Sequence, residues 1–517
     1  MNTGPALARA AAEALAMVST EPDVLEAEVF AGGSRSLLAR LSYTSHIPSN
    51  GVEEPKSSES SGLGIHVVLR GPDRPATGYG CEPDLGPDGA RRALARARRA
   101  AVVDPDFRSL PRPGATRRGL ESHRDPDLAA LRDEELVELG WRIVDAGLRT
   151  FLASSRLAAL AGDEAGLRRL GLILGGDVTV SQASMAIAST AMPRPQTDES
   201  TAIVATATAM VEAHHAKGTG WSAGPRLADF TGEAGADAVR AAIEAIGGER
   251  VPAGEYTVVF GPQPVADLLS NLVVPACRAD AFHASSTPFL GQLGRQVAAS
   301  LLRVYDDGGQ AGLAASRGIT DEGLATGRTD LIRDGLLVGC LASWYEAQRL
   351  RHDPRLADKL GAGAPAAAAA LVPRNGFRAA GPGEHAYAAP PRIAASNVVL
   401  EGAGAVDRDE LIRSVGHGLY IGRIWYTYPV NGMAAGDFTC TVVGDSFVIR
   451  DGRRGAPIRA NAIRINDSIG RLLRHVVGVA RERRGTPVWA ADEIIYTPEI
   501  AVTGVPVEAI DRSEEGS

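Results

Sequence analysis

Histidines that stand beside carboxylates are the side chains of this sequence best suited to chemistry. Glu212, His214 and His215 lie close together, and a helix would place Glu212 and His215 on one face, where they could share a metal ion. Zinc hydrolases commonly carry His-Glu-x-x-His, but none of the ten histidines here is followed by Glu. The segment also continues an apparent strand, in which neighbouring histidines point to opposite faces. A solvent-exposed strand end is the better interpretation.

A second possible metal set surrounds His283. Cys277 and Asp280 lie nearby in the segment ACRADAFHASS, so a Cys/Asp/His set is conceivable. The spacing matches no known site, and a lone histidine is more often structural. A stand-alone hydrolase with a rearranged metal site would draw its ligands from the following residues: His214, His215, His283 or His417, with Asp280 or Glu212.

Residues 220–224 (GWSAG) match the nucleophile-elbow pattern G-x-S-x-G, with Ser222 at the position of the nucleophile. That elbow needs a buried strand before the serine and a helix directly after it. The preceding EAHHAKG is no buried strand, so we expect a glycine-rich turn here instead.

Two pairs of neighbouring carboxylates could bind a cation: Asp306-Asp307 and Asp321-Glu322. Each pair is followed by glycine, as in an ordinary acidic turn. The sequence contains no P-loop, and Gly402-Ala-Gly404 lacks the third glycine of a dinucleotide loop. The residues alone therefore predict no self-sufficient active site.

Composition favours a globular protein of several domains. The chain has 517 residues, of which 44% are hydrophobic and 22% charged, enough to bury a large core. A net charge of −8 gives no attraction for phosphate backbones, so we expect no nucleic-acid partner. No apolar run is long enough to span a membrane, and Arg9 and Glu13 make the first segment an amphipathic helix rather than a signal peptide. We expect a cytoplasmic protein.

Local patterns predict the elements that must position these groups. The four scattered cysteines (Cys81, Cys277, Cys340 and Cys440) form no C-x-x-C pair, so cysteine pairing adds no constraint. Periodicity and turn residues predict helices over 1–20, 88–103, 128–154 and 234–246, strands over 24–31, 36–43, 63–71, 171–180, 183–192 and 201–210, and a polar loop over 45–62. Farther on they predict a strand over 256–262, helices from Pro264 and over 290–302 and 331–350, a low-complexity loop over 361–383, and a strand-rich tail. The predicted fold class is α+β: an N-terminal α/β domain over 1–115, a mixed central domain over 116–248 and a β-rich C-terminal domain over 249–517.

Several segments resemble one family, the TldD/TldE (PmbA) proteins. LGIHVVLRGPDRPATGYG resembles a strand pair of its first domain, and GEYTVVFGPQPVADLLSNLV resembles the strand and helix that open its large C-terminal domain. STPFLGQLGRQVAASLLRVYDDG and ITDEGLATGRTDLIRDGLLVGC follow the family pattern, as does GRIWYTYPVNGMAAGDFTCTVVGDSFVIRDG near the end. The resemblance covers most of the chain in the family's order. It implies the TldD/PmbA fold and a role in peptide-processing metallopeptidases, which are also known as modulators of DNA gyrase.

One departure from the family pattern decides what the resemblance implies. In TldD-type catalytic subunits the helix after the equivalent of YTVVFGP carries His-Glu-x-x-x-His, which binds zinc, and a later cysteine completes the site. Here residues 264–274 read PVADLLSNLVV, and the segment RERRGTPVWAADEIIY has no cysteine. The resemblance is therefore to the TldE-type subunit, and it implies no catalytic or metal-binding residue in this chain.

The resemblance thus implies a non-catalytic subunit, without a cofactor of its own, of a heteromeric zinc metallopeptidase that processes peptides or peptide-derived precursors. One expected partner is a TldD-like catalytic subunit, which would hold the zinc and carry out hydrolysis. The other is a peptide substrate, and segments 308–323 and 361–383 would line or gate its path. Alone, the chain could form a homodimer. Two alternatives remain open: the stand-alone metal-dependent hydrolase described above, and a binding or scaffold protein without peptidase activity.

Overall fold

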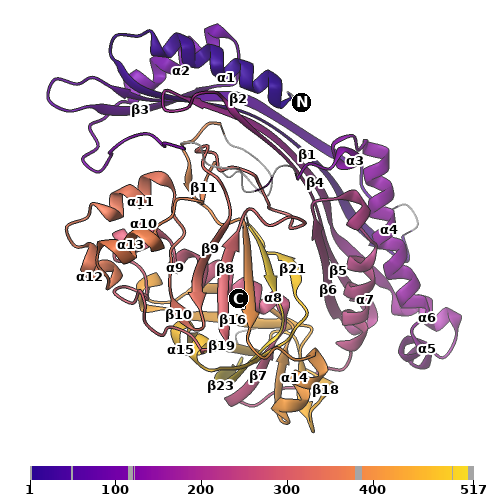
Figure 1. Cartoon of the computed structure of the whole chain (residues 1–517). Coiled ribbons are helices and arrows are strands. Elements are labelled where there is room, and N and C mark those ends of the chain that lie inside the picture. The colour runs from indigo at the N-terminus through magenta and orange to yellow at the C-terminus, as the bar shows by residue number, and fades with distance from the viewer. Residues whose placement is uncertain are drawn as a thin grey trace.

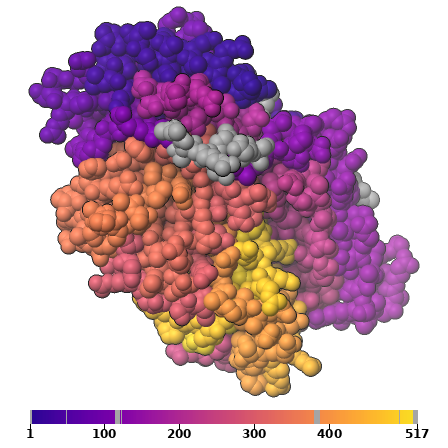
Figure 2. Space-filling view, viewed as in Figure 1, coloured from indigo at the N-terminus to yellow at the C-terminus, as the bar shows by residue number. Residues whose placement is uncertain are grey.

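The computed structural model describes residues 3–47, 50–113, 120, 123–378, 387–491 and 493–510. It divides into a long curved sheet with helices on its outer side and a β-rich C-terminal half that lies against the inner side (Figure 1). Figure 2 shows the indigo and purple first half arching over the orange and yellow C-terminal half. The predicted α+β fold class is confirmed.

The first sheet has six strands in the order β3-β2-β1-β4-β5-β6, and all its pairings are antiparallel. The strands are β1 (Val24–Thr44), β2 (Lys56–Leu69), β3 (Ala76–Glu82), β4 (Leu172–Ser189), β5 (Gln196–Val211) and β6 (Ala216–Gly224). Since β1 and β4 pair over seventeen positions, strands from both sides of residue 115 build one sheet. The boundary near residue 115 remains a prediction.

Helices cover the outer face of this sheet: α1 (Gly4–Ser19), α2 (Pro87–Ala100), α3 (Pro126–Ala129), α4 (Asp133–Leu152), α5 (Ser155–Ala161), α6 (Glu164–Leu170) and α7 (Glu233–Glu244). Glycines let two of them approach closely. A Cβ on Gly80 would lie 2.1 Å from the carbonyl oxygen of Ala93 in α2, and one on Gly220 would lie 2.1 Å from that of Ala234 in α7. Two apolar clusters, one under α1 and α2 and one under α4 and α7, fix these helices to the sheet.

The C-terminal half contains two large sheets. One has the order β10-β9-β8-β13-β22-β21, and the other runs β15-β16-β19-β23-β7-β14-β17-β18 with β20 paired to β23. Their strands are β7 (Gly254–Phe260), β8 (Leu302–Asp307), β9 (Arg328–Arg333), β10 (Leu336–Leu337), β13 (Asn397–Gly402), β14 (Gly418–Ile421), β15 (Arg423–Pro429), β16 (Asp437–Gly444), β17 (Phe447–Arg450), β18 (Arg453–Pro457), β19 (Ile463–Ser468), β20 (Val476–Val479), β21 (Arg484–Pro487), β22 (Ile494–Thr497) and β23 (Ile500–Ala509). A small pair, β11 (Gly376–Phe377) with β12 (Arg392–Ile393), lies apart.

The helices of this half are α8 (Pro262–Leu268), the π-helical turn η3 (Leu269–Val273), α9 (Val274–Ala276), α10 (Ala279–His283), α11 (Trp344–Arg351), α12 (Leu356–Leu360), α13 (Ala364–Ala370), α14 (Arg408–Val415) and α15 (Ile469–Arg474). Both sheets and α8 through α10 contribute to the largest buried apolar cluster. No described helix is long and apolar enough to cross a membrane.

Several predicted elements are wrong in extent or type. The strands predicted over 24–31 and 36–43 are one strand, β1, because β2 and β4 supply hydrogen bonds on both sides of Gly32 and Gly33. Residues 56–62 of the predicted loop belong to β2. The helix predicted over 290–302 is absent, since Gly291 and Gly294 adopt left-handed φ angles of 70° and 79°.

Two more predictions need correction in the second half. The helix predicted over 331–350 is strand and turn up to Ser343, because Gly335, with φ of 79°, turns the chain between β9 and β10. The loop predicted over 361–383 contains α13, whose alanines have the highest helix propensity of any residue. Positions 379–383 of that loop lie outside the described residues.

Candidate functional site

The first predicted cluster lies in the tight connection between β5 and β6. Glu212 and His214 belong to the single turn η1 (Glu212–His214), and His215 follows it with a left-handed φ of 50°. Both histidines are exposed, and Glu212 faces His46 instead, 3.3 Å from its Nδ1. The strand ends at Val211, so the interpretation as a solvent-exposed strand end is close to what the structure shows. His417, on another exposed turn, lies 3.7 Å from Asp451.

His283 ends α10, but its two predicted companions have other partners. Its Nε2 lies 3.4 Å from Asp353, and its carbonyl oxygen accepts a hydrogen bond of 2.5 Å from Lys359. Asp280 pairs with Arg278, and Cys277 lies in the apolar core, where burial raises the pKa of its thiol to about 12. Within the described ranges, no three His, Cys, Asp or Glu side chains are grouped so that they could hold a metal ion.

Ser222 is an internal residue of β6, pairs with Ala205 of β5, and is followed by two further strand residues. The predicted glycine-rich turn is therefore wrong, and no helix opens directly after the serine as an elbow would require. The glycines of GTGWSAG serve the sheet instead, because Gly218 and Gly220 allow α7 to pack closely on β6.

The two carboxylate pairs end in separate buried networks. Asp306 accepts hydrogen bonds from the backbone N–H of Ser396 (2.7 Å) and from Asn375 Nδ2 (2.6 Å), and burial raises its pKa to about 7. Glu322 accepts from the backbone N–H of Trp344 at 3.0 Å, and burial raises its pKa to about 8. Since the protein supplies donors to both carboxyls, they form no shared cation site.

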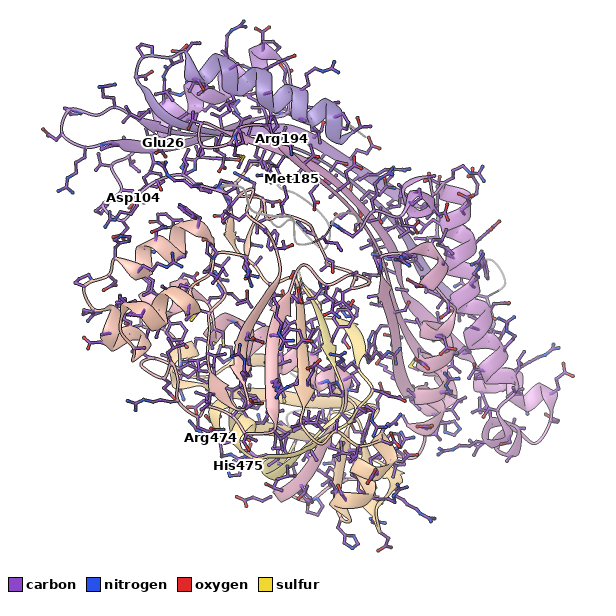
Figure 3. All side chains as sticks on the ribbon, viewed as in Figure 1. Glu26, Asp104, Met185, Arg194, Arg474 and His475 are labelled. Carbon is purple, nitrogen blue, oxygen red and sulfur yellow. The ribbon has the colours of Figure 1, made fainter. Side chains whose placement is uncertain are left out.

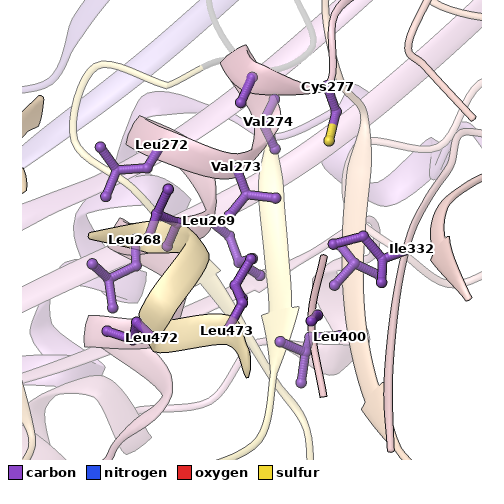
Figure 4. Close-up of a cluster of buried hydrophobic side chains, with 14 of the residues drawn as sticks. Leu268, Leu269, Leu272, Val273, Val274, Cys277, Ile332, Leu400, Leu472 and Leu473 are labelled. Carbon is purple, nitrogen blue, oxygen red and sulfur yellow. The ribbon is translucent and has the colours of Figure 1, made fainter. Parts of the chain in front are cut away.

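The helical segment from Pro262 to Ala276 occupies the position at which the family resemblance leads us to look for metal ligands. Its side chains fill the core: Leu268, Leu269, Leu272 and Val273 are each at most 3% exposed. Figure 4 shows them packed with Leu472 and Leu473 of α15, and near Leu400 and Ile332 of the neighbouring strands. The segment contains no imidazole or thiolate, the nitrogen and sulfur donors that zinc prefers, so its residues do not fit a zinc site.

A groove of about 330 Å³ runs beside this segment. Ser270 Oγ donates a hydrogen bond of 2.5 Å to Glu493, and Asn271 Nδ2 donates one of 2.9 Å to the carbonyl oxygen of Asp267. Both residues lie on the π-helical turn, a feature often found at functional sites. Hydroxyl, amide and carboxylate groups of this kind can form hydrogen bonds with a peptide.

Two buried residues, Glu28 and Arg378, and the half-buried His66 lie where the two halves meet, and the sequence analysis did not single them out. Glu28 of β1 pairs with Arg378 at 2.9 Å, and His66 of β2 lies close by in the sheet, with a pKa lowered by burial to about 4. The only signal in the sequence was a charged residue within an apolar strand. That signal cannot name a partner 350 positions away.

Comparisons with known proteins place this architecture in context. A model of the PmbA/TldA metallopeptidase C-terminal domain matches residues 253–509. A metalloprotease TldD homolog from Haemophilus influenzae is 26% identical over 284 residues, and this alignment spans 52% of either chain, about half of that relative's length. The crystal structure of TldE from Thermococcus kodakarensis superposes with a TM-score of 0.75 at 19% identity, covering 96% of this chain and 100% of that one. The structure of a Thermotoga maritima protein superposes with a TM-score of 0.72 at 17% identity, covering 96% of this chain and 99% of that one.

Proposed function

Because this chain belongs to the TldD/TldE (PmbA) family, we propose that it is the TldE-like, non-catalytic subunit of a heteromeric zinc metallopeptidase. In this proposal the complex processes peptides or peptide-derived precursors. The zinc and the base that activates water reside in a TldD-like partner, and this chain supplies binding surface.

One observation carries the proposal: the helical segment Pro262–Ala276 faces the core with leucine and valine side chains. A zinc hydrolase must present at least two or three ligands and a base to one point. Giving this segment such ligands would put polar groups among Leu268, Leu272 and their neighbours, where unpaired polar atoms are costly. The segment is thus built for packing.

The edge of the nine-stranded sheet supports a binding role. β15 pairs only with β16 within the described sheet. On its other side Gln263 of α8 bonds the backbone N–H and carbonyl oxygen of Ile424, so an added strand could reach only the bulged segment beyond Ile424. Tyr426 and Tyr428 on this strand are 68% and 53% exposed, and Trp425 lies 6.0 Å from the exposed ring of Trp489. An extended peptide or a strand of the partner could pair with such an edge through backbone hydrogen bonds.

Co-expression with a TldD-like protein that carries His-Glu-x-x-x-His tests the proposal. We expect a stable heteromer that cleaves unstructured peptides, whereas neither chain alone does so at the same rate. Replacing the partner's Glu of that motif by Gln should abolish cleavage and leave the complex assembled. Cleavage by this chain alone, lost on replacing His215 and His283 by Ala, would contradict the proposal and support the stand-alone hydrolase.

A further inference from the structure

A second cavity, of about 360 Å³, lies where β1, β2 and β3 meet α11, far along the chain from the groove beside Pro262–Ala276. Its walls come from the first sheet, from the segment after α2 and from the start of α11. Figure 3 labels Asp104 on that segment, between the first sheet and α11. The side chains that line it include Glu28, His66, Tyr79, Asp104, Glu322 and Trp344.

The aromatic walls of this cavity already have partners for their polar atoms. Trp344 Nε1 donates a hydrogen bond to the carbonyl oxygen of Ser109 (3.0 Å), and Tyr79 donates its hydroxyl to that of Tyr387 (2.5 Å). Tyr345 donates to Asp104 at 2.9 Å, and His66 Nε2 lies 2.7 Å from the hydroxyl of Thr77. What these side chains can still offer a ligand is therefore mainly ring surface.

The charged side chains that line the cavity, within the described part of the chain, are all acidic: Glu28, Asp104 and Glu322. Glu28 is neutralised by Arg378, which is itself only 1% exposed and approaches at 2.9 Å. Glu322 differs. It is 3% exposed, both its oxygens share the backbone N–H of Trp344, and no basic side chain of the described residues forms an ion pair with it. The Arg378 guanidinium acts on Glu322 only from a distance and lowers its pKa against the larger effect of burial, so the carboxyl group has no direct ion-pair partner in the cavity that it lines.

A buried carboxyl without a direct ion-pair partner, enclosed by aromatic rings, matches one ligand chemistry. Ring faces attract cations through their quadrupole, and a carboxylate forms charge-assisted hydrogen bonds with ammonium or guanidinium groups. An anion would meet three carboxyl groups, and a purely apolar ligand would make no use of the Glu322 carboxyl. We propose that this cavity binds an organic cation: a protonated amine or guanidine on a short apolar stem. The volume suits a single lysine- or arginine-sized group. The inference is independent of the partner subunit.

Binding of such a cation is coupled to the protonation of Glu322. Burial keeps this carboxyl largely protonated near neutral pH, because its pKa is about 8. A bound cation would favour the carboxylate, so the site would release a proton as it fills. The titratable and charged groups around Glu322 include the neighbouring Asp321 and Arg378 after β11. The others are Glu28 on β1, His66 on β2, Tyr79 on β3, Asp104 after α2 and Tyr345 on α11.

Isothermal titration calorimetry on the purified chain alone tests this inference. The probes are n-butylamine, the peptide acetyl-Ala-Lys-Ala-amide and its neutral analogue with norleucine in place of lysine. We expect the amine or the lysine peptide to bind at pH 7 with a heat that depends on the buffer, which reports the released proton, and the norleucine peptide to bind much more weakly. If the lysine peptide binds more tightly than butylamine, the ligand is a peptide side chain. If butylamine binds more tightly, the ligand is a free amine.

Variants then assign the binding to the cavity. Glu322→Gln should weaken binding of the cationic probe by about tenfold or more, the usual effect of losing a hydrogen bond to a charged group, and should remove the buffer dependence. Trp344→Leu keeps the backbone N–H that Glu322 accepts from and should also weaken binding, which guards against a folding defect in the first variant. Glu346→Gln is the matched control. Glu346 carries a carboxyl group on α11, the helix that begins at Trp344, and it does not line the cavity. Equal binding of the lysine and norleucine peptides, no binding of any cation, or binding unchanged in Glu322→Gln would overturn the inference.

Discussion

Arg378 is a buried arginine that joins the C-terminal half to the first sheet through several hydrogen bonds. Its guanidinium donates to Glu28 (2.9 Å), to the carbonyl oxygen of Asp321 (2.7 Å) and to that of Ala389 (3.0 Å), and it lies 4.3 Å from the centre of the Phe30 ring. A buried ion pair has a large desolvation cost, which these additional bonds offset. The pair therefore specifies how the first sheet meets the C-terminal half.

Replacing Arg378 by Met should lower the free energy of unfolding by about 3–5 kcal/mol, because it leaves the Glu28 carboxyl buried without its partner. The double variant Glu28→Gln with Arg378→Met should lose clearly less, since neither side chain then carries an unpaired charge. Urea unfolding of the wild type, Arg378→Met, Glu28→Gln and the double variant measures these changes. A double variant that is destabilised as much as the sum of the two single variants would show that the two side chains are not coupled.

The raised pKa of Glu322 predicts that the free energy of unfolding depends on pH. Its pKa rises from 4.5 to about 8 on folding, so the folded chain holds the proton more tightly than the unfolded chain. The free energy of unfolding should therefore fall as the pH rises from about 4.5 to about 8 and level off above that.

In Glu322→Gln this contribution disappears. The stability of the variant relative to the wild type should increase between pH 5 and pH 8, by roughly 1.4 kcal/mol per pH unit at most. Urea unfolding at several pH values gives the difference, in which other groups such as Asp306 cancel. A difference that does not change with pH would contradict the assignment.

Among the elements, the segment α8-η3-α9 is the one on which the proposed non-catalytic role depends. Its leucine and valine side chains pack between the two C-terminal sheets and against α15 (Figure 4). The register of this segment is fixed by Pro262 and Pro264 at its start and by its buried face, so exposing other side chains would require the helix to rotate out of the core.

Leu272→Ala should destabilise the fold by about 2–5 kcal/mol, because the side chain is 1% exposed and its removal leaves a cavity. Leu290→Ala is the control, since Leu290 is 39% exposed and should cost much less. Chemical denaturation of both variants checks the expectation. Equal, small losses would mean that this segment is loosely packed.

Sequence patterns predicted some elements well and others poorly, for identifiable reasons. Helices such as α2 and α4 have a clear apolar stripe, and the resemblance correctly indicated the family. Lengths of strands such as β1 depend on pairing partners far along the chain, which no local window contains. The cavity lined by Glu28 and Glu322 could not be predicted at all, since it joins residues about 300 positions apart.

At the scale of the whole molecule, polar contacts join the first sheet to the C-terminal half at both ends of the arch. Arg484 of β21 donates to the carbonyl oxygen of Trp221 (2.6 Å) and to Asp237 (2.7 Å), and it lies 4.3 Å from the centre of the Trp221 ring. Thr219 donates to the half-buried Asp445 at 2.9 Å. These bonds join β6 and α7 to the C-terminal half.

Arg484→Ala should loosen this end of the arch and lower the free energy of unfolding by about 1–3 kcal/mol. The carbonyl oxygen of Trp221 and the carboxylate of Asp237 both lose their donor. Hydrogen exchange should rise in β6 and β21 but not in β1. Arg481→Ala removes an arginine that is 65% exposed and paired with Asp407 on the surface, and should leave the exchange unchanged. Faster exchange in both variants would indicate a general effect of lost positive charge.

Zinc content and peptide cleavage, determined on the same samples of this chain alone and in complex with a TldD-like partner, test the proposed subunit role. We expect no stoichiometric zinc and no cleavage with the chain alone, and one zinc per heteromeric pair, with cleavage, in the complex. A purified chain that holds one zinc per molecule and cleaves peptides without a partner would contradict the central claim.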